Sequence, residues 1–154
     1  MRRPAFPLLL VLAALSFLAA PAAALSPFFV FFDRGSARIG AHYDQLLDNT
    51  IEQARLAEAG YLLIEARTDS AGPAAANLAL ARRRGAAVKA ALVRRGFRAD
   101  RILVIAYGEE DPHVPTPDGL AEPRNRMVAI HLTRICRSPP GLPPPPQPLP
   151  GCPR

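Results

Sequence analysis

The chain has 154 residues, 18 of them proline, and carries a formal net charge of +6 at pH 7. Both ends differ in composition from the rest and leave 107 residues, 27–133, for a folded core. This length is near the commonest domain size, so we expect these residues to form one domain. The positive charge is compatible with a polyanionic partner, namely nucleic acid, anionic lipid or a cell-wall polymer.

Residues 1–24 have the organisation of an export signal. Arg2 and Arg3 provide positive charge, an apolar stretch follows over 8–20, and residues 22–24 are the small residues that a signal peptidase needs. The apolar stretch is shorter than the roughly 20 residues of a membrane-spanning helix. We therefore expect a cleaved signal peptide, with an uncleaved anchor helix as the alternative. No cysteine lies near the predicted cleavage point, so we expect no lipid attachment there.

The first two predicted elements are a strand and an amphipathic helix. Aromatic and β-branched residues fill positions 28–32, which predicts a strand buried on both faces or nearly so. A helix is predicted over about 41–59, because apolar residues recur there at three- and four-residue spacing. Gly60 is predicted to stop this helix, since glycine accepts the left-handed conformation.

A second strand and a second helix flank a short polar loop. Residues 61–66 are almost continuously apolar, which predicts a central strand covered on both faces. The loop 67–72 leads into a helix predicted over about 74–95 and stopped by Gly96. Its predicted inward stripe consists of Leu78, Ala81, Gly85, Val88 and Leu92. Its predicted solvent-facing basic residues are Arg82, Arg83, Lys89, Arg94 and Arg95.

Two further strands complete the predicted domain. An apolar run over 101–107 predicts a third strand, and alternation over 126–132 predicts a fourth with one wetter face. The loop between them contains three prolines and a turn or short helix at about 121–124. Right-handed crossovers would make the strands around each helix parallel and leave the last strand antiparallel. The fold class is therefore α+β: a single domain ordered β-α-β-α-β-(loop or short helix)-β, with a mixed four-stranded sheet and helices packed on one side.

Residues 134–154 are predicted to form a proline-rich tail outside the domain. Nine of the 18 prolines lie between residues 138 and 154, and such a run favours extended polyproline II over a packed core. The two cysteines, Cys136 and Cys152, both lie in this tail. In an oxidising compartment they could close a loop or pair between chains.

The sequence offers little for catalysis or for a cofactor. His42, His113 and His131 lie in three segments, with no cysteine or acid at metal-ligand spacing. Neither a Gly-x-Ser-x-Gly elbow nor a Gly-x-x-x-x-Gly-Lys phosphate loop occurs. We therefore expect neither an enzyme nor a bound cofactor. Nucleic acid is also not expected as a partner, because no aromatic residues are interleaved with the arginine clusters and the chain carries an export signal.

One acid and one base near the second strand are the best candidates for binding. Asp69 follows this strand and precedes a helix, a position at which open sheets place ligands. Arg84 lies fifteen residues further on, and Asn77 shares its helical face, with the small Ala81 between them. Spacing alone leaves two structural interpretations open. Asp69 could cap the N–H groups of the following loop, or it could form an ordinary ion pair with Arg84.

The segments around these residues resemble the signature of OmpA-like peptidoglycan-binding domains. That family reads roughly Gly-His-Thr-Asp, then Asn-x-x-Leu-Ser-x-x-Arg-Ala-x-x-Val. This chain has Ala66-Arg67-Thr68-Asp69, then the segment 77–88. The similarity extends to Phe31-Phe32-Asp33, to Tyr107-Gly108-Glu109 with Pro112, and to Asn125-Arg126-Met127-Val128. It covers nearly all of residues 28–132.

The resemblance implies a non-catalytic protein that binds peptidoglycan in the periplasm and anchors the outer membrane or an envelope complex to the cell wall. In this family an aspartate and an arginine hold the diaminopimelate residue of the stem peptide, and Asp69 and Arg84 fall on those positions. A carboxylate matches the ammonium of that residue, and a planar guanidinium matches its carboxylate with two hydrogen bonds. Further expected ligand-binding residues are Thr68, Asn77, Asn125 and Arg126.

The chain departs from the family signature in the frame around the two charged residues. Arg67 adds a positive charge two residues before Asp69, and Ala81 lacks the hydroxyl of the signature serine. The other departures are Ala66, Gly85 and Met127. They support an alternative hypothesis, in which an exported structural or interaction protein keeps the fold, has weakened or lost wall binding, and binds other envelope proteins.

Overall fold

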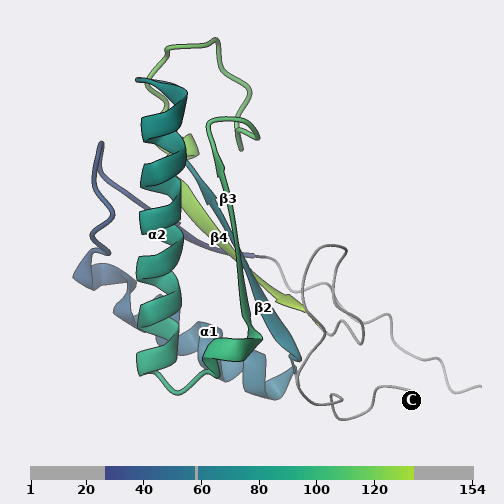
Figure 1. The fold of residues 1–154 in the computed structure, drawn as a ribbon. Coiled ribbons are helices and arrows are strands. Elements are labelled where there is room, and N and C mark those ends of the chain that lie inside the picture. The colour runs from purple at the N-terminus through teal and green to yellow at the C-terminus, as the bar shows by residue number, and fades with distance from the viewer. Residues whose placement is uncertain (1–26, 58, 134–154) are drawn as a thin grey trace, which may run out of the picture.

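The structure is a computed structural model that describes residues 27–57 and 59–133. The predicted export signal and the predicted proline-rich tail with its two cysteines lie outside these residues. The described residues form four strands and two long helices, and Figure 1 shows how they are arranged. They are β1 (Phe28–Phe31), α1 (Asp44–Leu56), β2 (Tyr61–Arg67), α2 (Ala74–Arg94), β3 (Ile102–Gly108) and β4 (Met127–Thr133). Three short 3-10 helices are also present: η1 (Ala41–Tyr43), η2 (Ala99–Arg101) and η3 (Pro123–Asn125). Of these, η3 corresponds to the turn or short helix predicted before the last strand.

The four strands form one mixed sheet in the order β1-β4-β2-β3. β2 and β3 are parallel, whereas β4 runs antiparallel to both of its neighbours, β1 and β2. The crossover through α1 therefore leaves a gap between β1 and β2, and the last strand fills it. The antiparallel orientation predicted for this strand is confirmed.

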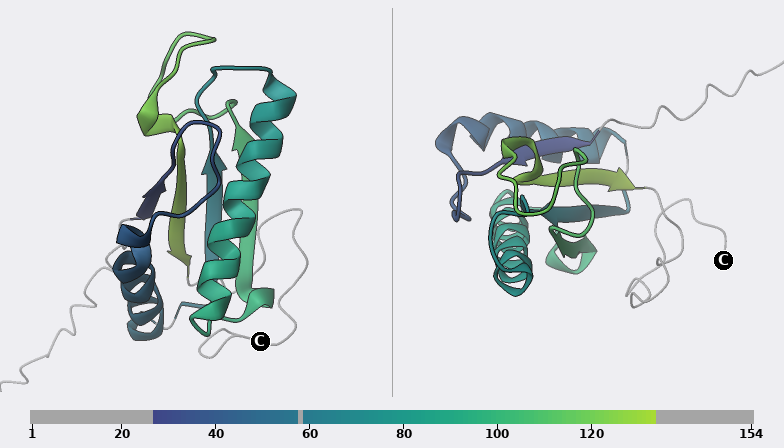
Figure 2. Two further views of the ribbon diagram at one scale, coloured as in Figure 1. Left: turned by 90° about the vertical axis from the view of Figure 1, so that its left-hand side faces the viewer. Right: turned by 90° about the horizontal axis from the view of Figure 1, so that it is seen from above.

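Both helices cover the same face of the sheet. Ile64 of β2 lies opposite Ile130 of β4 and Val104 of β3, so these side chains point to one side. They share a hydrophobic core with Leu47 of α1 and Val88 of α2. Figure 2, in its left view, shows α1 and α2 in front of the strands. The predicted packing of helices on one side is confirmed.

Two burial expectations for the strands are wrong. β1 is an edge strand, and Phe31 remains 40% exposed, so β1 is not buried on both faces. β2 is central as predicted, but Leu63 and Glu65 on its second face are only partly buried. An apolar run predicts a strand, whereas the number of covered faces depends on where the helices cross the sheet.

The inward face of α2 is more polar than its pattern predicted. Leu78 is only partly buried, whereas Asn77 and Arg84 face the interior. Gly85 allows close packing of α2 on the sheet, because a Cβ atom there would lie 2.6 Å from Cγ1 of Val104. The buried residues of α2 are Asn77, Leu80, Ala81, Arg84, Gly85, Val88, Ala91 and Leu92.

Two of the basic residues predicted to face solvent have partners instead. Arg95 pairs with Asp44 at 2.6 Å and with Asp48 at 2.7 Å, and so ties the end of α2 to α1. Lys89 Nζ donates to the carbonyl of Ile102 at 3.1 Å. Within residues 27–57 and 59–133, no helix is both long and apolar enough to cross a membrane.

The end of the first helix also differs from the prediction. α1 ends at Leu56, before the predicted end at about residue 59. Gly60 donates its N–H to the carbonyl of Thr133 at 2.9 Å, so it belongs to the start of the β2–β4 pairing and not to a helix stop. Gly96 does follow α2 with a φ of +92°, as expected for a helix stop.

Candidate functional site

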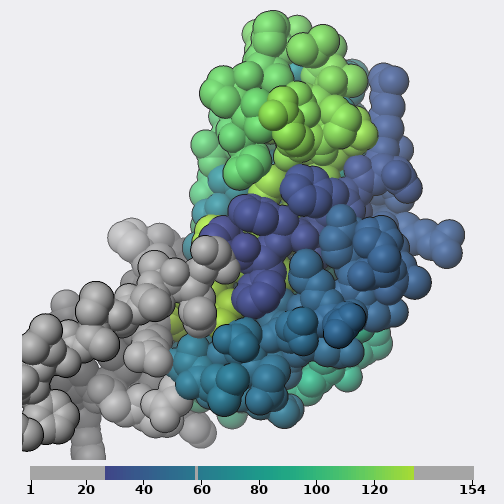
Figure 3. All heavy atoms as spheres, turned by 180° about the vertical axis from the view of Figure 1, so that it is seen from behind, coloured from purple at the N-terminus to yellow at the C-terminus, as the bar shows by residue number. Residues whose placement is uncertain are grey.

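Three chain segments meet at one edge of the sheet: 32–40 after β1, 68–73 after β2, and 109–126 between β3 and β4. They meet because β1, β2 and β3 end at this edge and the antiparallel β4 begins there. Figure 3 shows from behind that the green atoms of the third segment lie directly above the purple atoms of β1. Strand ends of this kind are where open sheets place ligands.

Asp69 lies in the second of these segments and pairs with an arginine from the third. Its carboxylate is nearly buried, with the residue 5% exposed, and accepts a hydrogen bond from Nη1 of Arg126 at 3.2 Å. Nε of Arg126 donates to the carbonyl of Phe32 at 3.2 Å. Arg126 therefore links the end of β1 to the loop that follows β2.

Arg84 lies near this pair, and its side chain donates to backbone carbonyls. Its side chain is 0% exposed. It donates to the carbonyls of Ser36 at 2.9 Å, Arg67 at 3.0 Å and Asp33 at 3.0 Å. Its guanidinium carbon also lies 5.0 Å from the ring centre of Phe32. Arg84 thus ties α2 to segment 32–40 and to the end of β2, while Asp69 pairs with Arg126 instead.

The charge of Arg84 is retained despite its burial. Desolvation lowers the pKa of its guanidinium to about 10, and the attraction of Asp69 acts in the opposite direction. Repulsion from Arg126 and Arg83 lowers the pKa further. At neutral pH the group is therefore protonated, and a fixed positive charge lies under the Asp69–Arg126 pair.

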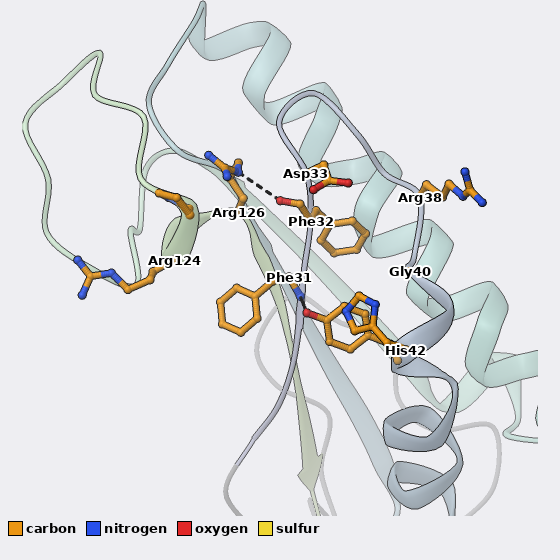
Figure 4. Close-up of a pocket in the computed structure, with 10 residues that line it drawn as sticks. Phe31, Phe32, Asp33, Arg38, Gly40, His42, Arg124 and Arg126 are labelled. Carbon is orange, nitrogen blue, oxygen red and sulfur yellow. Dashed lines mark hydrogen bonds between the residues drawn. The ribbon is translucent and has the colours of Figure 1, made fainter.

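An open cavity of about 590 Å³ adjoins the pair, and we refer to it as the arginine cavity. Its charged walls are Arg38, Arg124 and Arg126 against one acid, Asp33. Figure 4 shows Arg126 turned toward the Phe32 carbonyl, whereas Arg38 and Arg124 extend outward. The other lining residues are Phe31, Phe32, Gly40, His42, Tyr43 and Pro123. This combination suits a ligand that carries an anionic group.

Of the six expected ligand-binding residues Arg126 lines the arginine cavity, Asp69 and Arg84 lie behind it, and the other three have contacts elsewhere. Asn77 donates to the carbonyl of Gly72 at 3.4 Å and to the carboxylate of Glu109. Asn125 holds Val114 through its amide, accepting from the backbone N–H at 2.7 Å and donating to the carbonyl at 2.9 Å. Thr68 is 1% exposed, and its hydroxyl has no hydrogen-bond partner. The six residues therefore form two groups. Thr68, Asn77 and Asn125 make up one, and Asp69, Arg84 and Arg126 make up the other.

Sequence reasoning missed three charged residues of the arginine cavity, namely Asp33, Arg38 and Arg124. Asp33 lies in the segment Phe31-Phe32-Asp33 that carries part of the family resemblance, so a signal for it was present. The two arginines carry no local signal, because only the folding of segments 32–40 and 109–126 onto one edge brings them to one cavity. Across residues 27–57 and 59–133, no group of three or more His, Cys, Asp or Glu is arranged to hold a metal ion.

Comparison with known proteins places this fold and site in a family. A model of the OmpA family matches residues 31–126, which include all six expected ligand-binding residues. The chain belongs to the OmpA family. The resemblance predicted from the sequence is thereby confirmed.

Individual relatives cover the same part of this OmpA-family chain. Outer membrane protein A of Bordetella avium is 35% identical over 102 residues, which are 66% of this chain and 53% of that protein. A peptidoglycan-associated lipoprotein of Haemophilus influenzae is 34% identical over 101 residues, 66% of each chain. The matches thus span between about half and two thirds of these relatives. Among solved structures, the peptidoglycan-associated lipoprotein of Burkholderia pseudomallei superposes with a TM-score of 0.61 at 27% identity, covering 67% of this chain and 87% of that one.

Two departures of this OmpA-family domain from the signature, Arg67 and Met127, are accounted for by contacts other than Asp69. Arg67 pairs with Glu65 at 2.9 Å and with Asp111, and its guanidinium carbon lies 4.6 Å from the ring centre of Tyr107. Desolvation by burial lowers the pKa of the Arg67 guanidinium, but its hydrogen bonds to Asp111 and Glu65 outweigh this effect, so the pKa is raised. The extra positive charge of Arg67 is therefore matched by two acids. Met127 is 1% exposed and fills a packing position.

Proposed function

We propose that this OmpA-family domain is a non-catalytic peptidoglycan-binding module that holds the diaminopimelate residue of the stem peptide beside the arginine cavity. The observation that supports this proposal most directly is the hydrogen bond between Asp69 and Arg126, close to the buried positive charge of Arg84. An acid and a base at one open edge match a carbon that bears both an ammonium and a carboxylate. The proposed location is the periplasm, where the protein anchors the outer membrane or an envelope complex to the cell wall.

In this proposal each charged residue has a part that its present contacts support. A ligand ammonium takes the place of the Arg126 guanidinium on Asp69, because both groups are cations that can pair with the Asp69 carboxylate. The released Arg126 already lines the arginine cavity and meets the ligand carboxylate there. Arg84 is the second pole, and a ligand oxygen reaches it by replacing the carbonyls of Asp33 and Ser36.

Two further features support this proposal. Segment 32–40, which supplies the carbonyls of Asp33 and Ser36, is partly exposed, so these hydrogen bonds can exchange for bonds to a ligand. Relatives that match this chain over the same residues include proteins named peptidoglycan-associated lipoprotein. A planar guanidinium also forms two parallel hydrogen bonds with a carboxylate, which provides specificity.

The first test is sedimentation of the full chain with insoluble peptidoglycan sacculi. Wild type is expected in the pellet, and Asp69→Asn and Arg126→Gln are expected largely in the supernatant. Matched controls are Asp100→Asn and Arg94→Gln, which alter exposed residues of η2 and of the last turn of α2. Equal sedimentation of Asp69→Asn and wild type contradicts the proposal.

A second test addresses the diaminopimelate contact itself. Soluble stem peptides are compared that carry either diaminopimelate or lysine at the same position. Lysine keeps the ammonium but lacks the carboxylate, so wild type is expected to bind the lysine peptide at least about tenfold more weakly, as the loss of a charge-assisted hydrogen bond implies. The Arg126→Gln variant is expected to lose most of this discrimination. Equal affinity of wild type for both peptides argues against an arginine-held carboxylate.

One observation favours a second candidate function. Arg84 is fully enclosed and Asp69 already has a partner, so both poles are satisfied without a ligand. The second candidate is an exported structural or interaction protein that keeps the OmpA-like fold with weakened or lost wall binding and contacts other envelope proteins. Failure of wild type to sediment with sacculi, together with a folded domain, selects this second candidate.

A further inference from the structure

A second cavity separates the loop after β2 from the long loop before β4. Its volume is about 280 Å³, and its walls are Thr68, Ser70, Glu109, Glu110, Pro112, Thr116, Asp118 and Asn125. A water molecule occupies about 30 Å³ of liquid, so this space takes a group much larger than one water. Hydrogen bonds from Ser70 Oγ to the carbonyls of Pro117 and Leu120, both at 3.3 Å, connect the two loops around it.

The charge of this cavity, hereafter the acidic cavity, is opposite to that of the arginine cavity. Glu109, Glu110 and Asp118 line it, and none of its lining residues is Arg, Lys or His. Asn125 lines the acidic cavity and the next residue, Arg126, lines the arginine cavity, so adjacent residues contribute to two sites of opposite charge. The acidic cavity therefore favours a cation.

A buried hydroxyl in the wall points to a specific ligand. Thr68 lines the acidic cavity, is 1% exposed, and its Oγ1 has no hydrogen-bond partner. Burying a polar group without a partner is unfavourable, so a hydrogen-bonding ligand would be favoured at this position. Thr116 Oγ1, which accepts from Asn125 at 3.2 Å, and the carboxylate of Glu109 add further acceptors.

The acceptors suit a polyatomic cation better than a metal ion. In the described part of the chain, no three His, Cys, Asp or Glu side chains are arranged to hold a metal, so the carboxylates do not converge on one point. A primary ammonium carries one charge and three N–H donors, which can be shared between a carboxylate and hydroxyl oxygens. We propose that the acidic cavity binds the primary ammonium group of a small amine or of a peptide, with Thr68 Oγ1 and Glu109 as acceptors.

This proposal does not rest on peptidoglycan binding, because none of the residues of the Asp69–Arg126 pair lines the acidic cavity. The test uses the ¹⁵N-labelled full chain and follows amide chemical shifts. Titration with 1,5-diaminopentane is expected to shift the amides of Thr68, Ser70 and Glu109. N-acetyl-lysine amide presents the same ammonium on a peptide, and the relative affinities of the two probes distinguish a free amine from a peptide as the source.

A matched probe separates hydrogen bonding from charge alone. The hexamethylated analogue of 1,5-diaminopentane has the same charge and spacing but no N–H donor. Its affinity is expected to be at least about fivefold lower, the effect of losing roughly one net hydrogen bond. Equal affinity of the two probes overturns the proposal, as do larger shifts with Ca²⁺ at the same amides.

Variants locate the bound amine. Thr68→Val is expected to keep the stability of wild type, because its hydroxyl has no partner to lose, and to weaken amine binding about fivefold. Glu109→Gln is expected to weaken it about tenfold, whereas Glu52→Gln, which alters an exposed residue of α1, serves as the control. Asp69→Asn is expected to leave the amine affinity within about twofold, since it removes no cavity acceptor. Loss of binding with Asp69→Asn places the amine at the proposed diaminopimelate site and overturns this inference.

Discussion

Asp69 accepts a hydrogen bond at 3.2 Å from Arg126, which lies 57 residues later in the chain. Arg84, the base that spacing suggested as the partner of Asp69, instead donates to three backbone carbonyls beneath it. One arginine is therefore open to the arginine cavity and the other is enclosed. In the proposed function Arg126 meets the ligand directly, whereas Arg84 holds the surrounding loops until a ligand oxygen replaces the carbonyls of Asp33 and Ser36.

Loss of Arg84 is expected to destabilise the domain. Arg84→Ala leaves three carbonyls without their donor, and we expect a loss of about 2–4 kcal/mol in the free energy of unfolding. Urea denaturation of the full chain measures this loss. The matched control is Arg83→Ala, which alters the preceding, exposed residue and is expected to change stability by no more than about 0.5 kcal/mol. Similar midpoints for both variants contradict the supporting part given to Arg84.

Arg67 is expected to matter for stability and not for ligand binding. Arg67→Met removes the donor to Glu65 and Asp111 from a side chain that is 11% exposed, so we expect a loss of about 1–3 kcal/mol. Sedimentation with sacculi is expected to remain that of wild type, because Arg67 pairs with Glu65 and Asp111 and not with Asp69. Arg82→Met, at an exposed position of α2, is the control. A change in sedimentation without a change in stability refutes this separation.

Gly108 is expected to be required for the close approach of α2 to β3. It has a φ of +66°, and a Cβ atom there would lie 3.1 Å from both Cα and N of Leu78. Gly108→Ala is therefore expected to cost about 2–4 kcal/mol, as the sum of left-handed strain and a backbone contact. Gly35→Ala shares the positive φ, +67°, but meets nothing within 4 Å, so it isolates the strain at about 1–2 kcal/mol. If the two variants have equal unfolding free energies, the backbone contact with Leu78 does not contribute to the cost of Gly108→Ala.

Glu122 is expected to titrate at unusually low pH. Hydrogen bonds from the side chain and backbone N–H of Arg124 lower the pKa of its carboxyl to about 2. Because the folded pKa lies below the ordinary value, the interaction is fully present above that value and is lost as the pH falls through about 2. Side-chain carboxyl NMR over this range measures it, and Arg124→Ala is expected to return the pKa toward the ordinary value. An ordinary pKa in wild type contradicts the contact.

Local patterns in the sequence were sufficient for most of the fold. Apolar periodicity predicted four strands and two helices, and chain connectivity predicted that the last strand would be antiparallel. The family resemblance, carried by segments such as Ala66-Arg67-Thr68-Asp69, was confirmed by the match to the OmpA family. These features depend on residues close together in the chain, which is why the sequence alone determined them.

The partners of the charged residues depended on tertiary structure. Whether Arg84 would face Asp69 or the carbonyls of Asp33 and Ser36 depends on where the loop after β1 crosses α2, and no local pattern encodes that crossing. The edge position of β1, with Phe31 40% exposed, likewise follows from the insertion of β4 beside β2. Two cavities of opposite charge arise because segments distant in the chain fold onto one edge of the sheet. The sequence by itself determined which residues carry charge near that edge, and the packing of three loops decided which of those charges meet.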